Sequence, residues 1–398
     1  MRLLRCDHAS RKRGLGSSMH VMHVIDTLHG GGAETSLLEV VPGLVSRGVR
    51  TSVITLFPDD GGLEDRLRAL GLARTRLTRR DPLGLTFELR SIMRAERPDL
   101  VHTTLLFSNL AGRLAARANR IPVVTTLANQ DYGPEHRANS RYGALGVRGV
   151  QGAELISAPL TARFHAISAD VASVMSRRLR IPSDRIQVVY RGRDPAGLGT
   201  PTQDRRLRTR SELSIAPDTP VVLSVGRLDR QKGIDTTIDA FRRLIERRAD
   251  AVLLVAGRPG NASSVIHAKA KGCATVRFLG HRRDVPDLMC AADVLSFPSR
   301  WEGLGGTLIE AMALRLPIVA SDIPPLAETI GDARWPLVRP DDAEALMSEL
   351  DALLVPSSFN EARKDAGQRR FRMLFTAEAA ADGMAGLYRG ALQVSMHR

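Results

Sequence analysis

The sequence of 398 residues is poor in cysteine, with only Cys6, Cys273 and Cys290, none in a CxxC pair or close to a histidine at metal-ligand spacing. This excludes a disulfide framework, predicts no metal site and fits a reducing compartment. The sequence also lacks an apolar run of about 18 residues that would cross a bilayer, and no apolar stretch follows the basic residues of its start. We therefore expect a cytoplasmic protein in which residues 1–18 are a disordered basic extension before Met19.

Lysine and aromatic residues are scarce, although the formal net charge is +14. Only five of the 57 basic residues are lysine, a bias that a GC-rich genome would also produce. Aromatic residues make up 4% of the chain and supply few stacking platforms, and there is no zinc-finger or RNP-type motif, so we expect no nucleic-acid partner. The charge favours a phosphorylated substrate or salt-sensitive contact with an anionic membrane. The arginines expected at such a membrane are Arg74, Arg76, Arg79 and Arg80.

Short apolar runs alternate with helical spacing in two successive series. The first series contains the runs VMHVIDTL, TSVITLF and PVVTTLA, with helices expected at 87–97 and 150–162 among others. The second contains PVVLSVG, AVLLVAG and ADVLSFPS. Buried parallel strands have this composition, and two βα series of this length predict two doubly wound, Rossmann-like α/β domains facing across a cleft.

The alternation also suggests where the domains begin and end. Residues 196–217 collect Pro, Gly, Asp and Arg without periodicity, which is typical of a linker. We expect an N-terminal domain at 19–195, a C-terminal domain at 218–375, and a helix at 376–398 that packs back on the first domain.

Two glycine-containing loops follow strands and have weak signals on their own. Gly30, Gly31 and Gly32 precede a helix and would let backbone N–H groups approach an anion, although a plain βα turn looks the same. In GRLDRQKG, Arg227 and Lys232 lie five residues apart and could converge on a diphosphate, whereas the alternative is a solvated loop.

A third segment, PSRWEGLGGTLIEA, carries the strongest signal. Glu302 follows a strand, a glycine-rich loop comes next, and Glu310 lies in the first turns of a helix. Glycines permit close approach of phosphates, the helix N-terminus favours anions, and a carboxylate such as Glu310 can accept hydrogen bonds from a diol. The alternative is that Glu310 caps the helix and Glu302 is exposed.

Together these motifs resemble the retaining glycosyltransferases of family 4, which have the GT-B fold of two Rossmann-like domains. The resemblance is carried by EGLGGTLIEAMA, GRLDRQKG, FLGHRRDVPDLMCAADVLSFPS and PIVASDIPPLAETIG, and in the first half by GGGAE, RPDLVHTTLLFSNLAGRLAAR and VVYRGRDP. It implies metal-independent transfer of a sugar from a nucleotide-diphosphate sugar, with retention and without a cofactor. It also implies that the domain at 19–195 binds the acceptor and that the domain at 218–375 binds the nucleotide sugar.

The resemblance also implies roles for individual residues. Arg227 and Lys232 would neutralise the donor diphosphate, Glu302 would contact the transferred hexose, and Glu310 would bind the ribose hydroxyls. The remaining donor contacts would come from the backbone of the glycine loop and from the turns around the base: Gly305, Gly306, Thr307, Leu308, Arg258, His281 and Arg282.

The chain departs from the family at one position. Many relatives carry a histidine after the fourth strand of the first domain, where this chain has Ala128. Contacts with the sugar or acceptor would then come from Asn129, Gln130 or Asp131. His102 and His165 are weaker substitutes, because a lone histidine at a strand end is usually a satisfied structural residue.

We therefore expect a glycosyltransferase acting on a glycan or lipid-linked acceptor in cell-envelope or exopolysaccharide synthesis, cytoplasmic or peripheral on the inner face of the membrane. Two alternatives remain at this point. One is a nucleotide-sugar epimerase on the same fold, which would need no acceptor. The other is a non-catalytic binder of nucleic acid or anionic surfaces, whose affinity would not depend on Glu302 or Glu310.

Overall fold

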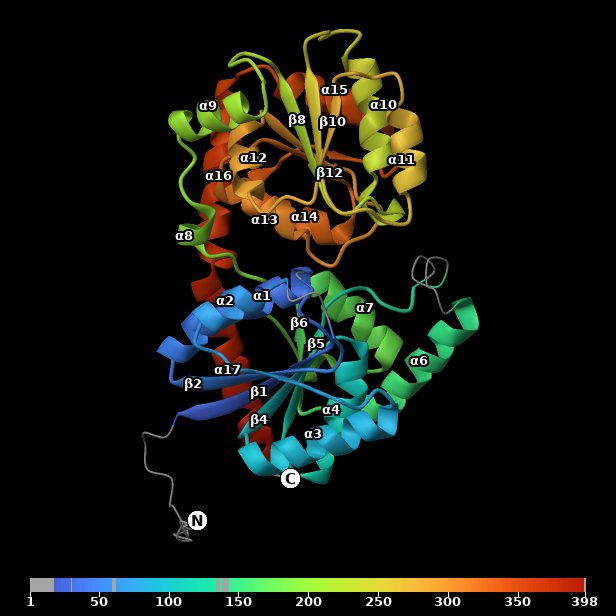
Figure 1. Cartoon of the computed structure of the whole chain (residues 1–398), viewed down its shortest axis with the longest axis vertical. Coiled ribbons are helices and arrows are strands. Elements are labelled where there is room, and N and C mark those ends of the chain that lie inside the picture. Colours follow the sequence, from blue (N-terminus) through green and yellow to red (C-terminus); the bar gives the residue numbers. More distant parts are fainter. Residues whose placement is uncertain (1–17, 30, 59–61, 134–136, 138–142, 397–398) are drawn as a thin grey trace.

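The computed structural model describes residues 18–29, 31–58, 62–133, 137 and 143–396, which form two α/β halves stacked end to end (Figure 1). The expected extension at 1–18, apart from Ser18, and Gly30 of the glycine loop lie outside the described residues. No helix within the described ranges is both long and apolar enough to span a bilayer.

The first half is built on a seven-stranded parallel sheet in the order β3-β2-β1-β4-β5-β6-β7. Its strands are β1 (Met19–Ile25), β2 (Val49–Thr55), β3 (Arg74–Arg76), β4 (Leu100–Thr104), β5 (Val123–Leu127), β6 (Arg163–Ala166) and β7 (Ile186–Val188). Its helices are α1 (Gly32–Ser46), α2 (Glu64–Ala69), α3 (Pro82–Glu96), α4 (Leu106–Ala118), α6 (Gly143–Ser157) and α7 (Ala169–Leu179). The strand order reverses between β1 and β4, which is the place where such sheets bind ligands beyond their carboxyl ends.

The second half repeats this plan with a six-stranded parallel sheet in the order β10-β9-β8-β11-β12-β13. Its strands are β8 (Val221–Val225), β9 (Val252–Ala256), β10 (Val276–Gly280), β11 (Val294–Phe297), β12 (Ile318–Ser321) and β13 (Leu337–Val338). Its helices are α10 (Ile234–Leu244), α11 (Ser263–Ala270), α12 (Val285–Ala291), α13 (Gly306–Ala313), α14 (Pro324–Ile330), α15 (Ala343–Leu353) and α16 (Ser358–Leu374). The expectation of two doubly wound α/β domains is confirmed.

The segment 196–217, interpreted from its composition as a linker, carries helical structure instead. Helix α8 (Pro195–Leu198) is followed by α9 (Gln203–Glu212), which packs on α12. The guanidinium of Arg210 is buried on α9 and donates to Asp293 Oδ2 at 2.8 Å and to the carbonyl of Ala291 at 2.9 Å. Because α9 is held by arginine contacts rather than an apolar stripe, its sequence shows no hydrophobic periodicity.

The last helix, α17 (Ala377–Met396), leaves the second half and packs on the first. Figure 1 shows α16 and α17 running along one side of both halves. Ala381, Ala385 and Tyr388 of α17 are buried in one cluster with Val40 and Leu44 of α1. The chain therefore crosses between the halves twice, before α8 and again between α16 and α17.

Candidate functional site

The glycine loop between β11 and α13 brings Glu302 to the junction of the two halves. Gly305 ends the loop with φ +87°, and a Cβ there would lie 2.7 Å from Leu326 Cδ2, so glycine is required for both conformation and space. Helix α13 begins at Gly306, with its first N–H groups at this loop. Glu302 is buried, with 7% of its surface exposed.

The second glycine-containing loop brings Lys232 to the same place. Lys232 Nζ forms an ion pair with Glu302 Oε1 and lies 5.5 Å from the centroid of the Phe297 ring. Gly233 follows with φ +62°, and a Cβ there would lie 2.1 Å from the carbonyl oxygen of Pro298. The glycine therefore lets this loop pack directly on the Glu302 loop.

Arg227 lies on the same loop but has a different partner. Its Nη1 is 2.8 Å from Asp229 Oδ2, and its side chain is 62% exposed. Arg227 and Lys232 thus come from one loop at the sheet edge, with Lys232 paired with the buried Glu302 and Arg227 paired with Asp229 on the exposed side of the loop.

Glu310 has a partner that the sequence analysis missed. Its Oε1 accepts a hydrogen bond of 2.6 Å from Nε of Arg193, a residue of the segment that crosses between the halves. The backbone of Arg193 is fixed by the carbonyl of Phe375 and the N–H of Ala377. The guanidinium lies directly over the start of α13, since a Cβ at Gly306 would be 2.7 Å from Arg193 Nη2.

A second arginine of the crossing segment, Arg191, was also missed. Its Nη1 lies 3.1 Å from the position of a Cβ at Gly32, so it packs against the start of α1. Burial and the charge of Arg193 lower the pKa of Arg191 to about 10, opposed by the carboxylates of Glu34 and Glu302. Arg191 therefore adds positive charge between the glycine loop of the first half and Glu302 of the second.

The loop after β5 touches the Glu302 loop. A Cβ at Gly303 would lie 2.9 Å from the carbonyl oxygen of Ala128 and 3.5 Å from Asn129 Cα. Asn129 accepts from the N–H of Gln130 at 2.9 Å, and Gln130 Nε2 donates to Asp170. Asp131 lines a cavity in the first half.

The two histidines considered as substitutes are structural. His102 Nδ1 lies 2.8 Å from Tyr388 Oη and its Nε2 lies 2.7 Å from Thr126 Oγ1. His165 bonds Thr126 and the carbonyl oxygen of Val189. Burial lowers the pKa of both rings, that of His165 to about 4, so they stay neutral.

The residues expected around the base are only partly brought together. Arg258 Nη2 lies 3.3 Å from His281 Nε2, whereas Arg282 is engaged by Asp284, with Nε 2.8 Å from Oδ1. Among the described residues, no group of three His, Cys, Asp or Glu side chains is arranged to hold a metal ion.

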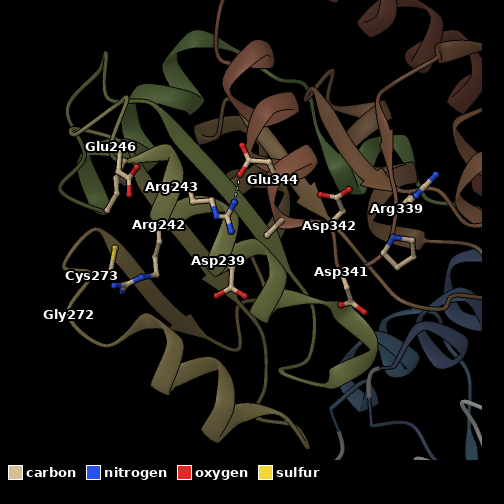
Figure 2. A pocket seen from close by; sticks show the side chains of 13 residues that line it. Asp239, Arg242, Arg243, Glu246, Gly272, Cys273, Arg339, Asp341, Asp342 and Glu344 are labelled. Atoms are coloured by element: carbon tan, nitrogen blue, oxygen red, sulfur yellow. Dashed lines mark hydrogen bonds and ion pairs between the residues drawn. The ribbon is translucent and has the colours of Figure 1, made fainter.

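A charged hollow of the second half lies away from this junction. Figure 2 shows Asp239, Arg242 and Arg243 of α10 lining this hollow of about 920 Å³, with Arg243 in an ion pair with Glu344 of α15. Its lining is charged and solvent-open, and neither Glu302 nor Glu310 contributes to it.

Comparison with known proteins agrees with this geometry. The family description "Glycosyltransferase Family 4" matches residues 30–196, and "Glycosyl transferases group 1" matches residues 219–355. A D-inositol 3-phosphate glycosyltransferase of Jonesia denitrificans is 26% identical over 90% of this chain and 91% of its own length. The lipopolysaccharide core biosynthesis mannosyltransferase LpsB of Rhizobium meliloti is 28% identical over 46% of this chain and 55% of its own.

A solved structure shows the same fold. The Anabaena protein HepE in complex with UDP-glucose superposes with a TM-score of 0.80 over 93% of this chain and 99% of its own, at 19% identity. The two family descriptions coincide with the two halves, and the junction carries the paired carboxylates and the lysine of the motif. The chain is therefore a GT-B glycosyltransferase of the family 4 type.

Proposed function

We propose that the protein transfers a sugar from a nucleoside diphosphate sugar with retention of the anomeric configuration and without a required metal ion. The observation that carries the proposal is the contact of Lys232 with Glu302 beside the start of α13. In the proposed reaction Lys232 would bind the diphosphate and Glu302 would contact the hexose, and their contact supports a shared role at one site.

In the reaction, the bond between the anomeric carbon and the diphosphate oxygen breaks, and the acceptor oxygen bonds to the same face of that carbon. The hydroxyl proton of the acceptor passes to the departing diphosphate. Negative charge develops on the leaving group, where Lys232, Arg227 and the first N–H groups of α13 stabilise it. These groups supply the charge that a metal ion would otherwise provide, so we expect turnover to survive EDTA.

A donor screen tests this function. The full chain is melted with UDP, GDP and ADP and with their sugars, because a ligand at about 100 times its Kd adds roughly 2.7 kcal/mol to stability. Incubation of the preferred donor without an acceptor then separates transfer from epimerisation. A new nucleotide sugar formed from donor alone would refute the transferase, and loss of turnover in EDTA would refute metal independence.

We propose a lipid-linked or glycan acceptor of envelope or exopolysaccharide synthesis, reached from an anionic membrane. The support is an exposed apolar and basic face on α3 and α4, which pack on each other. Leu83 and Phe87 of α3 are 72% and 63% exposed, and Leu114 of α4 is 51% exposed. Arg90, Arg94 and Arg117 lie on the same two helices and form no ion pair within the described ranges.

The arginines expected at the membrane from the sequence are partly engaged within the protein. Arg74 and Arg76 share one oxygen of Glu64, each at 3.0 Å, and Arg80 donates to the carbonyls of Leu56 and Leu77. A single carboxylate cannot neutralise both Arg74 and Arg76, so these residues and Arg79 stay candidates for the same contact.

Flotation with vesicles of phosphatidylglycerol and phosphatidylcholine tests the membrane contact. We expect salt-sensitive binding that is lost in Leu83→Ser/Phe87→Ser and kept in Met373→Ser, an exposed apolar residue of the second half. Wild-type protein that stays in solution at low salt would show that the positive charge reflects the arginine-rich composition alone and does not serve membrane binding.

A further inference from the structure

A cavity of about 270 Å³ in the first half lies next to the transfer site and has no role so far. It opens at the carboxyl ends of β1, β4 and β5, between α4 and α6, and Ala128 forms part of its wall. The carbonyl of Ala128 is also the group against which Gly303 packs, so the cavity begins one residue contact away from the Glu302 loop.

One wall of this cavity presents hydrogen-bond acceptors that the protein does not satisfy. Asn109 is 5% exposed, and its Oδ1 has no hydrogen-bond partner among the described residues. Asp26 Oδ1 accepts from Ser108 N and Oγ at 2.8 and 2.6 Å, but Oδ2 has only a long contact of 3.4 Å with the N–H of Phe107. A buried acceptor without a donor is unfavourable, so this wall is suited to a ligand that brings hydroxyl donors.

The other polar groups of the cavity are engaged. Glu154 Oε1 accepts from Arg113 at 2.9 Å, and Oε2 accepts from Tyr132 Oη at 3.3 Å. The opposite wall is apolar and contains Leu106, Val147 and Val150. A ring with hydroxyl groups at its edge and C–H groups on its face matches both walls.

The size and charge of the cavity restrict the class of ligand further. The cavity, at about 270 Å³, has room for one six-membered ring with its substituents. The described residues that line the cavity include Asp26, Asp131 and Glu154 and no lysine, arginine or histidine. A phosphate on the ring would meet carboxylates here.

We propose that this cavity binds the acceptor head group as a single neutral polyhydroxylated ring, a hexose or a cyclitol, held by Asn109 and Asp26. The inference rests on the proposed transfer function, since the ring would present a hydroxyl toward the donor site beyond Ala128. A larger side chain at position 128, where many relatives have histidine, would take part of this volume. The small side chain of Ala128, where the chain departs from the family, therefore leaves room for a ring to bind in this cavity.

Ligand-observed NMR on the full chain, with the preferred nucleoside diphosphate present, tests the proposal. The neutral probes are myo-inositol and the methyl α-D-glycosides of glucose, mannose and galactose, and the charged probes are inositol 3-phosphate, glucose 6-phosphate and mannose 6-phosphate. We expect at least one neutral ring to bind at millimolar concentration or below, and more tightly than its phosphorylated counterpart.

Two variants locate that binding. Asn109→Leu should raise the Kd of the ring at least tenfold, and Ala128→Leu, which fills space without removing a polar group, should do the same if the first variant fails to fold. Asn119→Leu is the matched control, because this asparagine at the end of α4 donates to the carbonyls of Arg90 and Ala115, outside the cavity.

The nucleoside diphosphate Kd, measured on the same samples, separates this proposal from the donor site. An unchanged nucleotide Kd with a weakened ring Kd supports the cavity. Absence of binding by all four neutral rings, tighter binding of the phosphorylated rings, or an unchanged ring Kd in the folded variants would overturn it. Failure of the wild-type chain to bind any nucleoside diphosphate would instead refute the proposed function.

Discussion

Glu302→Gln should tighten the binding of free nucleoside diphosphate while it slows transfer. In the described structure Glu302 forms an ion pair with Lys232. Both side chains are largely buried, with 9% of Glu302 and 20% of Lys232 exposed. The amide keeps the shape of the carboxylate and still accepts from Lys232, but it removes a negative charge from the neighbourhood of the diphosphate.

The size of the expected change in nucleotide affinity follows from electrostatics. A unit charge about 8 Å from the diphosphate contributes about 2 kcal/mol at an effective dielectric constant of about 20, and solvent screening reduces this toward about 1 kcal/mol. Binding should therefore tighten about fivefold to thirtyfold. Turnover should fall by about a hundredfold, because an oriented electrostatic contact with the sugar is worth roughly 3 kcal/mol in the transition state.

The assay is titration calorimetry with the preferred nucleoside diphosphate, together with kcat and urea unfolding. Asp239→Asn is the matched control: it removes a second lysine–carboxylate pair, with Lys269, far from the glycine loops, and should change neither value. Unchanged or weaker nucleotide binding in folded Glu302→Gln would show that Lys232 does not meet the diphosphate. Near-normal turnover would show that Glu302 is structural.

Three further predictions follow from the same contacts. Lys232→Ala should weaken nucleoside diphosphate binding about tenfold to a hundredfold and leave nucleoside binding unchanged by calorimetry, because only the charge-assisted bond is lost; equal losses would indicate misfolding. Glu310→Ala should weaken the binding of nucleoside diphosphate and of nucleoside alike. It should also lower the free energy of unfolding in urea by about 1–3 kcal/mol, because Arg193, 9% exposed, loses its partner. A selective loss of diphosphate binding would contradict the ribose role. The free energy of unfolding should also fall by about 3 kcal/mol between about pH 7 and pH 5.5. Burial lowers the pKa of His23 to about 3, that of His165 to about 4 and that of His102 well below 6.5. The unfolded chain therefore binds protons in this range that the folded chain does not. Asp26, whose pKa is raised to about 6 by burial, opposes this by about 1 kcal/mol, and equal urea midpoints at the two pH values would refute the account.

The alternation of strands and helices was predictable because each parallel strand is buried on both faces. Val221–Val225 and Val252–Ala256 appear in the sequence as short apolar runs, and the structure makes both of them strands. Helix boundaries were less accurate. The helix expected at 87–97 begins at Pro82, where Asp81 caps it through the N–H of Gly84 at 2.6 Å, a start signal that the apolar spacing does not contain.

The site was predictable where its residues lie on one continuous segment. Glu302 and Glu310 are separated by seven residues and one glycine loop, so their motif is visible in the sequence. Arg193 is 117 positions from Glu310, and Asp26 is 82 positions from Ser108. Their importance comes from contacts made by the fold, and nothing in the neighbouring residues indicates those contacts.

The two halves are joined by apolar packing and by polar contacts, and one of the polar contacts involves Glu310, the residue that we propose for the ribose. Glu328 of α14 accepts from the N–H groups of Ala169 and Asp170 at 2.7 and 3.1 Å, which caps α7 of the other half. Ser168 Oγ donates to the carbonyl of Gly303 at 2.7 Å. Because a ribose bound to Glu310 would compete with Arg193 for the same carboxylate, we expect donor binding to alter a contact between the crossing segment and the second half. If Glu310 binds the ribose as we propose, its pairing with Arg193 would link occupancy of the nucleotide site to the contact between the crossing segment and the second half.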